Sequence, residues 1–327
     1  MYIRMESKTI LIFGGTGSLG YALNTRYNKT NIIYNFSRDE CKHWEMKLHF
    51  NSNPNIRFII GNISDKSIVE STIQRICPDI IIIGSAMKHI DQCEINTSES
   101  LKTNLLGTQN VLDSIESNLR ILLNLETVVF ISSDKACSPV NNYGMCKALS
   151  ETFVVEKAYY IPSVKFVNVR YGNVLNSRGS IIPLLHKIGK DPVKKYFTLT
   201  SPDMTRFVMT LDQSVDLIEY ATLNGESGDT IIPKLISMNV KDLMDIFSVK
   251  YSKPIVITGL RSGEKMLESL INETQSGRIV VHGDYTHIKS VLKYPDAIHE
   301  SVKDYNSRTN TLTKSELETY LLNLTLI

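Results

Sequence analysis

The sequence predicts an α/β protein built on a doubly wound, mostly parallel sheet, with a smaller C-terminal lobe. Up to residue 172, short apolar runs alternate with longer amphipathic stretches, the rhythm of repeated strand–helix units. The short runs are apolar almost throughout, as expected for strands covered by helices on both faces. After Gly172, repeated prolines interrupt the pattern and the helices become shorter, which indicates a second lobe.

Each element follows from this periodicity. Strands are expected at Thr9–Phe13, Asn31–Phe36, Arg57–Ile60, Asp79–Gly84, Thr127–Ser132 and Lys165–Arg170. Helices are expected at Leu19–Tyr27, Asp39–Phe50, Ser67–Ile76, Ser98–Glu116 and Tyr143–Tyr159. A further helical pattern covers Arg206–Leu223. The expected division is therefore a first domain of residues 1–172, to which 206–228 return, and a lobe of residues 173–327.

Composition excludes several classes of protein. The 36 basic and 34 acidic residues give a net charge of +2, so no general attraction to nucleic acid or anionic membranes is expected. The cysteine count of 5 is odd and contains no C-x-x-C pair, which favours reduced thiols in a cytoplasmic protein over a disulfide framework, and no zinc-ligand spacing is present. The apolar run at Thr9–Phe13 is too short for a signal peptide or a membrane span.

A glycine-rich loop joins the first strand to the first helix. It reads Gly14-Gly15-Thr16-Gly17-Ser18-Leu19-Gly20, a G-x-x-G-x-x-G pattern. Glycines there let the backbone turn tightly beside a pyrophosphate, and the amides of the helix N-terminus stabilise its charge. This context predicts a Rossmann-type dinucleotide site, with Gly14, Thr16, Gly17, Ser18, Leu19 and Gly20 as cofactor-binding residues.

The end of the second strand bears on which dinucleotide binds. An NAD site usually places an acidic residue here to bind the ribose 2′-hydroxyl, whereas this chain has Ser37 and Arg38. A guanidinium at this point favours a 2′-phosphate, so NADP is expected over NAD. Asp39 is better placed to cap the next helix. The alternative is that Arg38 is an ordinary solvated surface charge.

The ends of the third and fourth strands lie at the same predicted edge of the sheet. Asn62 and Ile63 follow the third strand, and Asn62 could bind the adenine. Ser85 and Ala86 follow the fourth strand, where small residues let a cofactor pass close to the backbone. Lys88 is expected to face the same pocket. The neighbouring His89 is equally consistent with a structural role.

The fifth strand leads to a cluster of reactive side chains. Ser133 follows that strand, and Tyr143 and Lys147 are spaced Y-x-x-x-K, which puts them on one face of a helix. A nearby ammonium favours the phenolate, and such a Tyr can take the proton of a substrate hydroxyl while hydride leaves the same carbon. The Lys147 ammonium can also bind the nicotinamide ribose, and the Ser133 hydroxyl can orient the substrate oxygen.

At this point the chain resembles a known family. The glycine loop with Y-x-x-x-K is similar to the extended short-chain dehydrogenase/reductases, and further segments resemble the C5-inverting UDP-N-acetylglucosamine 4,6-dehydratases. These segments are S-R-D-E at 37–40, K-T-N at 102–104, S-D-K-A at 133–136, R-Y-G-N-V at 170–174, S-R-G-S at 177–180, M-T-R-F at 204–207 and R-S-G-E-K at 261–265. The resemblance spans residues 8–270.

The resemblance implies a lyase that removes water from a UDP-sugar. Tyr143 with NADP would oxidise C4, Asp134 would protonate the departing C6 hydroxyl, and Lys135 would remove the C5 proton before hydride returns to C6. Relatives that retain C5 carry Asp-Glu here, so Lys135 points to inversion. A Lys serves as a base only if burial or charge depresses its pKa. The alternative is a structural Asp134–Lys135 ion pair.

The resemblance also implies the remaining ligands and partners. Asn104 would bind the cofactor, and the UDP-sugar would contact Lys88, Tyr171, Asn173, Arg178, Thr205, Arg206, Arg261 and Glu264. Arginine pairs well with phosphate, although each of these side chains could instead be solvated. A homo-oligomer, dimer or higher, is implied, together with a place in nucleotide-sugar biosynthesis for a polysaccharide or glycan.

Two departures from the family pattern and two alternative functions remain open at this point. Ser133 replaces a usual Thr, and Asn62 replaces a usual Asp. A UDP-sugar 4-epimerase or reductase would share the glycine loop, Tyr143 and Lys147 but has no use for Asp134–Lys135. A non-catalytic NADP-binding protein would keep only the glycine loop.

Overall fold

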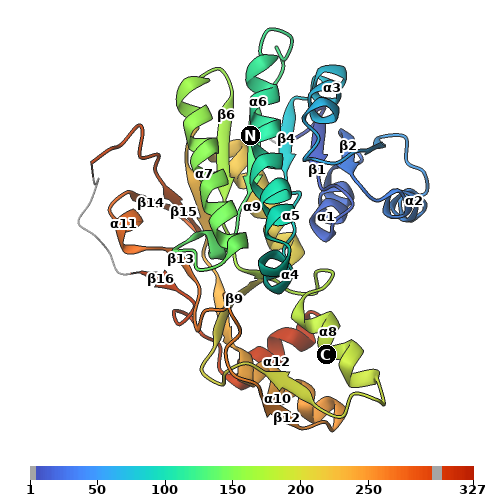
Figure 1. The fold of residues 1–327 in the computed structure, drawn as a ribbon, viewed down its shortest axis with the longest axis vertical. Helices are drawn as coiled ribbons and strands as arrows, with labels where there is room; N and C mark the ends of the chain where they lie inside the picture. The colour runs from blue at the N-terminus through green and yellow to red at the C-terminus, as the bar shows by residue number, and fades with distance from the viewer. Residues whose placement is uncertain (1–4, 297–303) are drawn as a thin grey trace.

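The computed structural model describes residues 5–296 and 304–327, and their centre is a nine-stranded sheet (Figure 1). Its strand order is β14-β15-β10-β6-β5-β4-β1-β2-β3. The strands are β1 (Thr9–Phe13), β2 (Ile32–Ser37), β3 (Ile56–Ile60), β4 (Ile80–Ile83), β5 (Thr127–Ile131), β6 (Lys165–Val169), β10 (Thr230–Pro233), β14 (Ile279–His282) and β15 (Tyr285–Ile288). All are parallel from β3 to β10, and β15 and β14 are antiparallel at the far edge. The predicted doubly wound Rossmann-type sheet is confirmed.

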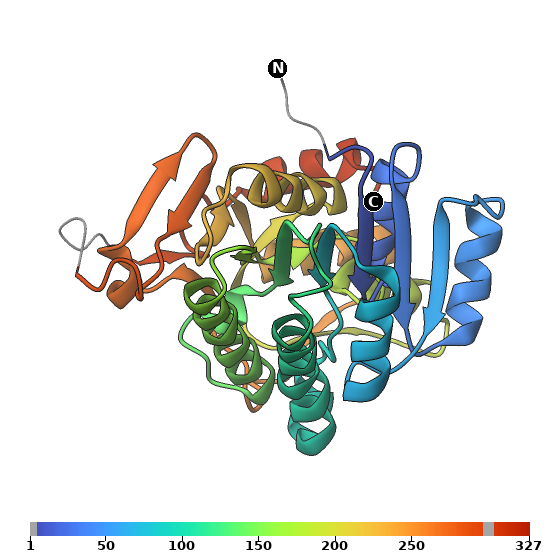
Figure 2. The same cartoon turned by 90° about the horizontal axis from the view of Figure 1, so that it is seen from above.

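Helices cover both faces of this sheet, as Figure 2 shows from above. On one face lie α3 (Lys66–Ile76), α6 (Gly107–Ser117) and α7 (Asn142–Tyr160). On the other lie α1 (Ser18–Tyr27) and α9 (Leu211–Asn224), which pack together. The helix α2 (Glu40–His49) lies by β3 at the sheet edge. The crossover helix α1, between β1 and β2, therefore lies on the opposite face from α6 and α7, which follow β4 and β5, as a doubly wound fold requires.

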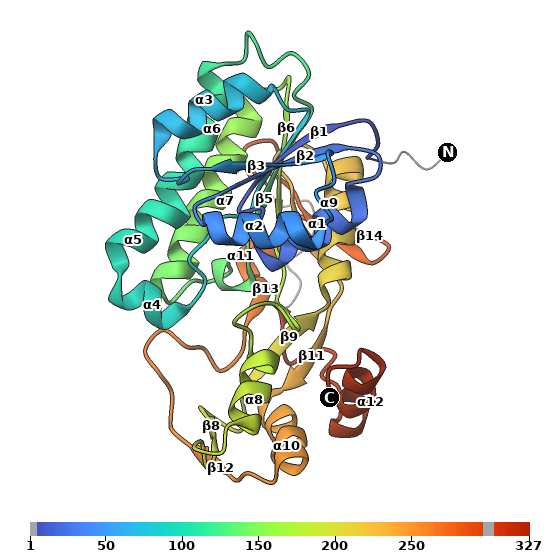
Figure 3. The same cartoon turned by 90° about the vertical axis from the view of Figure 1, so that its right-hand side faces the viewer.

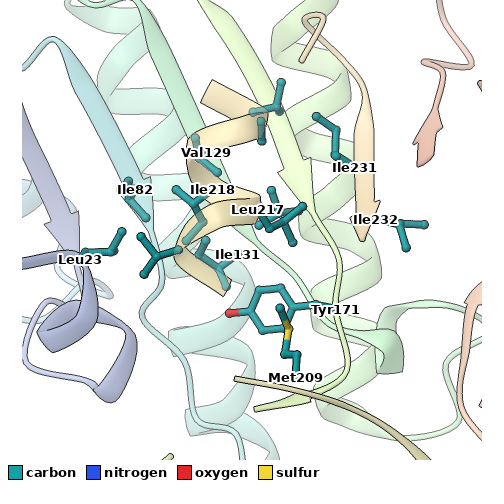
Figure 4. Close-up of a cluster of buried hydrophobic side chains, with 14 of the residues drawn as sticks. Leu23, Ile82, Val129, Ile131, Tyr171, Met209, Leu217, Ile218, Ile231 and Ile232 are labelled. Carbon is teal, nitrogen blue, oxygen red and sulfur yellow. The ribbon is translucent and has the colours of Figure 1, made fainter. Parts of the chain in front are cut away.

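Two hydrophobic cores explain why the strands read as continuous apolar runs. In β4, Ile80 and Ile82 point into the core under α9, and Ile81 and Ile83 point into the core under α3 and α6. All four side chains are buried. Figure 4 shows the first of these cores, where Leu217 and Ile218 of α9 lie over the strands. Burial on both faces removes any need for polar residues in the strand.

The second lobe has its own core and lies beyond the carboxyl edge of the sheet (Figure 3). Its strands are β7 (Asn173–Val174), β9 (Thr205–Met209) and β11 (Ile236–Asn239) in one sheet, with β8 (Phe197–Leu199) beside β12 (Ile255–Ile257) and β13 (Ser269–Ile271) beside β16 (Tyr305–Asn306). Its helices are α8 (Ile181–Lys190), α10 (Val240–Tyr251), α11 (Glu273–Ser276) and α12 (Lys314–Asn323).

The structure differs from the expected elements in three places. The helix expected over Arg206–Leu223 is wrong at its start, because residues 205–209 form β9 and α9 begins only at Leu211. A capping box of Thr210 and Gln213 fixes that start. The helix expected over Ser98–Glu116 is divided into α5 (Thr97–Leu101), a π-helical turn at Lys102–Leu106, and α6.

The third difference concerns how the chain is shared between the two lobes. Strands β10, β14 and β15 join the main sheet although residues 173–327 were all expected in the second lobe, apart from the returning segment. The chain therefore passes between the lobes several times after Gly172. No helix within residues 5–296 and 304–327 is both long and apolar enough to cross a membrane.

Candidate active site

A cleft of about 1080 Å³ lies at the carboxyl edge of the sheet, between the two lobes. Register aligns the strand ends there, since Phe13 lies opposite both Phe36 of β2 and Ile83 of β4. Most of the expected site residues line this cleft: Gly14, Thr16, Gly17, Ser18, Leu19, Gly20, Ser37, Arg38, Asn62, Ile63, Ser85, Ala86, Lys88, Ser133, Lys135, Tyr143, Lys147, Tyr171, Asn173 and Arg178.

The glycine loop folds back as a cradle against neighbouring backbone, and at two of its positions a side chain would clash with that backbone. Gly14 has a φ of +89°, and a Cβ there would lie 2.8 Å from the Ser85 amide nitrogen. A Cβ on Gly20 would lie 1.8 Å from the Gly15 carbonyl oxygen. Gly17 is the N-cap of α1 and offers no side-chain cap. The first-turn amides of α1 are therefore left available to an anion, which suits a diphosphate.

The neighbouring strand end supports the loop through its side chains. The Ser37 hydroxyl lies 2.9 Å from the Thr16 hydroxyl and 2.6 Å from His43 Nε2. Arg38 is exposed at the rim of the cleft. Asp39 accepts a hydrogen bond from the Lys42 amide and caps α2, as expected. Arg38 is thus free to turn toward a bound group.

Asn104 supports the cleft from behind without lining it. Its fully buried side chain accepts a hydrogen bond from the Met87 amide at 2.8 Å and donates one to the Met87 carbonyl at 3.0 Å. It also donates to the Ser100 hydroxyl. The amide therefore fixes the segment that carries Ser85, Ala86 and Lys88, in place of the expected direct cofactor contact.

Tyr143 lies in the first turn of α7, beside the end of β5. Asn141 caps this helix by accepting from the Gly144 amide at 2.8 Å. The Tyr143 phenol is hydrogen-bonded with Ser133. Burial raises the pKa of Tyr143 to about 12, and the nearby Lys135 ammonium opposes that rise. The phenol is therefore protonated at rest.

Lys147, expected as the cation that favours the phenolate, has its ammonium bound to the main chain at the end of β5. Its Nζ donates to the Ile131 carbonyl at 2.7 Å and lies 4.5 Å from the centre of the Phe130 ring. Burial lowers the pKa of Lys147 to about 8, and Glu151 opposes that fall. The cation that acts on Tyr143 is Lys135. The ammonium of Lys147 is held at the floor of the cleft.

Asp134 and Lys135 form a short ion pair next to Tyr143. Asp134 is fully buried, and its Oδ1 accepts from the Ser133 hydroxyl at 2.8 Å and from Lys135 Nζ at 3.0 Å. Its Oδ2 has no hydrogen-bond partner in the described part of the chain. Lys135 lines the cleft and also lies 3.4 Å from Asn173 Oδ1.

The expected depression of the Lys135 pKa is wrong. Burial alone would lower that pKa, but the carboxylates of Asp134 and Glu268 outweigh burial and raise it. Lys135 is therefore an ammonium at neutral pH. An unpartnered carboxylate oxygen beside an ammonium, both next to a phenol, is an arrangement suited to moving protons.

Four of the expected substrate contacts do not line the cleft. The Thr205 hydroxyl lies 2.7 Å from that of Ser307, and the buried Arg206 donates to the carbonyls of Thr205 and Lys265 at 2.8 and 2.9 Å. Arg261 is exposed and lies 3.5 Å from Glu264. Arg206 thus anchors the segment of residues 261–266 that carries those two side chains.

Sequence reasoning missed two buried charge clusters. Arg170 is fully buried and pairs through two nitrogens with Glu151, which also accepts from the Ser132 hydroxyl. Glu268 lies between Lys135 and Lys265. Arg170 stands in one of the motifs given above, whereas no local pattern marks Glu268.

Comparison with known proteins assigns the family. Residues 10–290 match the model of a family described as "Polysaccharide biosynthesis protein". A UDP-glucose 4-epimerase of Rickettsia bellii is 37% identical over 339 residues, covering 97% of this chain and 96% of the relative, and one from Rickettsia felis is 36% identical with the same coverage.

Solved structures agree with this fold. The X-ray structure of Pen from Bacillus thuringiensis matches with a TM-score of 0.88 and 33% identity, covering 100% of both chains. DesIV, a dTDP-glucose 4,6-dehydratase from Streptomyces venezuelae, shares the fold with a TM-score of 0.66 at 17% identity, over 79% of this chain and 86% of that one. With the glycine loop, the Tyr143–Lys147 pair and these matches together, the chain belongs to the polysaccharide biosynthesis protein family of extended short-chain dehydrogenase/reductases.

Proposed function

We propose that this protein is an NADP-dependent 4,6-dehydratase of a UDP-sugar. The substrate we favour is UDP-N-acetylglucosamine, and the product is the 4-keto-6-deoxy sugar nucleotide with C5 inverted. The observation that carries the proposal is the Asp134–Lys135 pair beside Tyr143. An enzyme that only oxidises and reduces C4 needs Tyr143 and Lys147 but has no use for a second acid–base pair.

The cleft fits a nicotinamide dinucleotide. The glycine cradle and the uncapped amides of α1 would hold its diphosphate, and Arg38 would pair with a 2′-phosphate. The bound cofactor supplies the hydride acceptor and donor for the sugar carbons. Lys147, held at the cleft floor by the Ile131 carbonyl, would bind the nicotinamide ribose through its remaining N–H groups.

Tyr143 would receive the proton of the C4 hydroxyl. Its pKa of about 12 means that the phenol must give up its own proton as it receives this one, and that proton would leave through the Ser133 hydroxyl, which lines the cleft, to the solvent. The Lys135 ammonium stabilises the phenolate once it forms. Ser133 also bonds to Asp134, so this hydroxyl joins the two acid–base groups.

Asp134 and Lys135 together would carry out the elimination. A proton moves from Lys135 Nζ to Asp134 Oδ1 across 3.0 Å, which leaves a neutral amine and a carboxylic acid. The amine then takes the C5 proton, made acidic by the C4 carbonyl, and the acid gives its proton to the departing C6 hydroxyl. This elimination returns the pair to its starting charges, loses one water and leaves a 4-keto-5,6-ene. The hydride first taken from C4 would return to C6, and a proton added at C5 from the opposite face would complete the inverted 4-keto-6-deoxy product.

A 4-epimerase is the second candidate, because relatives at 36–37% identity carry the name UDP-glucose 4-epimerase. It would use the same cleft, Tyr143 and Lys147 on UDP-glucose or UDP-N-acetylglucosamine. Asp134–Lys135 would then be a structural ion pair only. The two candidates differ in mass balance, because epimerisation conserves the mass of the sugar.

The deciding experiment incubates the protein and NADP with each of the two UDP-sugars in D₂O, followed by mass spectrometry and NMR. We expect UDP-N-acetylglucosamine to lose one water and to gain deuterium at C5. Asp134→Asn should keep transient C4 oxidation but lose the elimination. Lys135→Met should lose the elimination and also slow C4 oxidation, because the Tyr143 phenolate loses its cation, and Tyr143→Phe should lose both. Formation of a C4 epimer of unchanged mass would overturn the proposal.

A further inference from the structure

The buried carboxylate of Glu268 takes no part in the steps described above, yet it lies next to them. Its side chain is 2% exposed and projects between two lysines. Its Oε1 lies 3.9 Å from Lys135 Nζ, and its Oε2 lies 3.4 Å from Lys265 Nζ. Oε2 accepts no hydrogen bond from residues 5–296 or 304–327. A buried charge of this kind is costly unless neighbouring charges compensate it.

The backbone holds Glu268 in place from both sides. Its amide donates to the Ser307 hydroxyl at 3.1 Å, and its carbonyl accepts from the Ser307 amide at 2.8 Å. The adjacent Met266 carbonyl accepts from the Thr205 amide at 3.0 Å. The carboxylate is therefore placed by strand pairing in the second lobe, although it acts on a lysine of the first.

Four charged side chains surround Lys135 or its partner Glu268. Asp134 lies on its own turn, Glu268 lies opposite, and the cations Arg206 and Lys265 lie behind Glu268. Lys135 thus shares its ammonium between two carboxylates. Without Glu268, Lys135 would keep a single acidic partner and would face two uncompensated cations. Each carboxylate within about 4–6 Å favours the charged form of a lysine.

We propose that Glu268 is a positioning residue that sets the protonation state of Lys135 and holds its ammonium between the lobes. This inference rests on the proposed function only where it concerns removal of the C5 proton by Lys135. The carboxylate keeps Lys135 charged at rest, so that the amine forms only when Asp134 has taken the proton. Glu268 of the second lobe thereby controls when Lys135 of the first lobe becomes a neutral amine.

The first test measures Lys135 directly and needs no turnover. Lys135 lines the cleft, so its amine can be trace-labelled with acetic anhydride at a series of pH values and quantified by mass spectrometry. In Glu268→Gln we expect the labelling midpoint of Lys135 to fall by about one pH unit or more, because one opposing carboxylate is lost. Glu268→Asp should lie between the two. An unchanged midpoint in Glu268→Gln would overturn the inference.

The matched control is Ser307→Ala, which removes the hydroxyl that accepts from the Glu268 amide but keeps the carboxylate. It should lower the melting temperature without moving the Lys135 midpoint. If Ser307→Ala moves the midpoint as far as Glu268→Gln does, the role of Glu268 is packing alone and the inference fails. Circular dichroism of each variant establishes that it is folded.

The second test follows the reaction. In Glu268→Gln, C4 oxidation in a single turnover should stay within a few-fold of the wild-type rate, whereas deuterium exchange at C5 should become faster at neutral pH, because a larger share of Lys135 is then the neutral amine. In the pH profile of C5 exchange, the limb due to Lys135 is the one that is absent in Lys135→Met. In Glu268→Gln this limb should move to lower pH. If the wild type never eliminates water, the proposed function fails while the labelling shift still stands. If the wild type eliminates water and the midpoint does not move, only the Glu268 inference fails.

Discussion

At the scale of single residues, the buried ammonium of Lys147 lowers the free energy of unfolding of the protein at neutral pH. Its pKa is lowered from 10.5 to about 8 because its ammonium is buried over Phe130 with only one carbonyl partner. The unfolded chain therefore binds this proton more tightly than the folded one, and folding becomes more favourable as the pH rises from about 8 to about 10.5. At neutral pH the charged side chain is a net cost to the fold.

Lys147→Met should therefore abolish activity and still stabilise the protein. At pH 7 we expect a gain of about 1–3 kcal/mol in the free energy of unfolding, which is the cost of the shifted pKa less the lost hydrogen bond to Ile131. The gain should shrink as the pH rises from 8 to 10. Denaturant titrations at pH 7 and pH 10 measure it, and equal stabilities at pH 7 would contradict the expectation.

Arg38 is the residue that bears on cofactor choice. It is exposed at the rim of the cleft, with Asp39 already engaged in capping α2. Arg38→Ala should weaken NADP binding about tenfold or more, as expected for the loss of charge-assisted hydrogen bonds to a phosphate. NAD binding should change little, since NAD lacks that phosphate. Calorimetric titration of both cofactors gives the answer, and an equal loss for the two would exclude this role.

At the scale of secondary-structure elements, Asn141 joins helix α7 to the segment of residues 261–266. Its Oδ1 caps α7 at the Gly144 amide, and its Nδ2 donates to the Gly263 carbonyl at 2.8 Å. One side chain thus fixes both the start of the Tyr143 helix and the segment that carries Arg261 and Glu264. The two functions can be separated by substitution.

Asn141→Asp keeps the cap but loses the donor to Gly263, and Asn141→Ala loses both. We expect Asn141→Asp to retain stability within about 0.5 kcal/mol and to raise the KM for the UDP-sugar several-fold. Asn141→Ala should raise KM similarly and also lose about 1 kcal/mol of stability. Steady-state kinetics and thermal melts of the pair test this. A normal KM in Asn141→Asp would mean that the Gly263 tether does not serve the substrate.

The elements that could be predicted from sequence are those whose signals are local. The glycine loop and the cap at Asp39 depend on neighbours in the chain, and their positions followed from the sequence. Residues 205–209 could not be assigned, because the run T-R-F-V-M is buried at every position and so has no alternation that separates a strand from a helix. Tertiary pairing with β11 makes them a strand.

The same limit applies to the candidate site. The positions of Tyr143 and Lys135 at the cleft followed from strand ends and helix spacing. The partners that decide their protonation did not, because Glu268 and the carbonyls bound by Arg206 come from distant parts of the chain. The sign of the Lys135 pKa shift depends on those partners, and so the expectation of a depressed pKa was wrong.

At the scale of the whole molecule, the two lobes meet directly at the cofactor loop. The segment 175–180 leads from β7 into α8 of the second lobe, and Arg178 within it contacts the first lobe. Its amide donates to the Ser18 hydroxyl at 2.9 Å, and its guanidinium donates to the Thr16 carbonyl. Lys88 donates to the Arg178 carbonyl at 2.6 Å. A ligand that orders the glycine loop therefore also orders part of the second lobe.

This contact predicts positive coupling between the two ligands. We expect UDP to bind about fivefold or more tightly to the NADP-loaded protein than to the free protein, and NADP affinity to rise by the same factor when UDP is present. In Arg178→Ala the guanidinium contact with Thr16 is lost, and the ratio should fall toward one. Calorimetric titrations of UDP with and without NADP, and of NADP with and without UDP, measure the two affinity ratios. Thermodynamic linkage requires the two ratios to be equal, which checks the data. A variant that keeps the wild-type ratio would show that the Arg178 guanidinium does not carry the coupling, which would then run through the backbone contacts of residue 178 with Ser18 and Lys88 or through the bound ligands themselves.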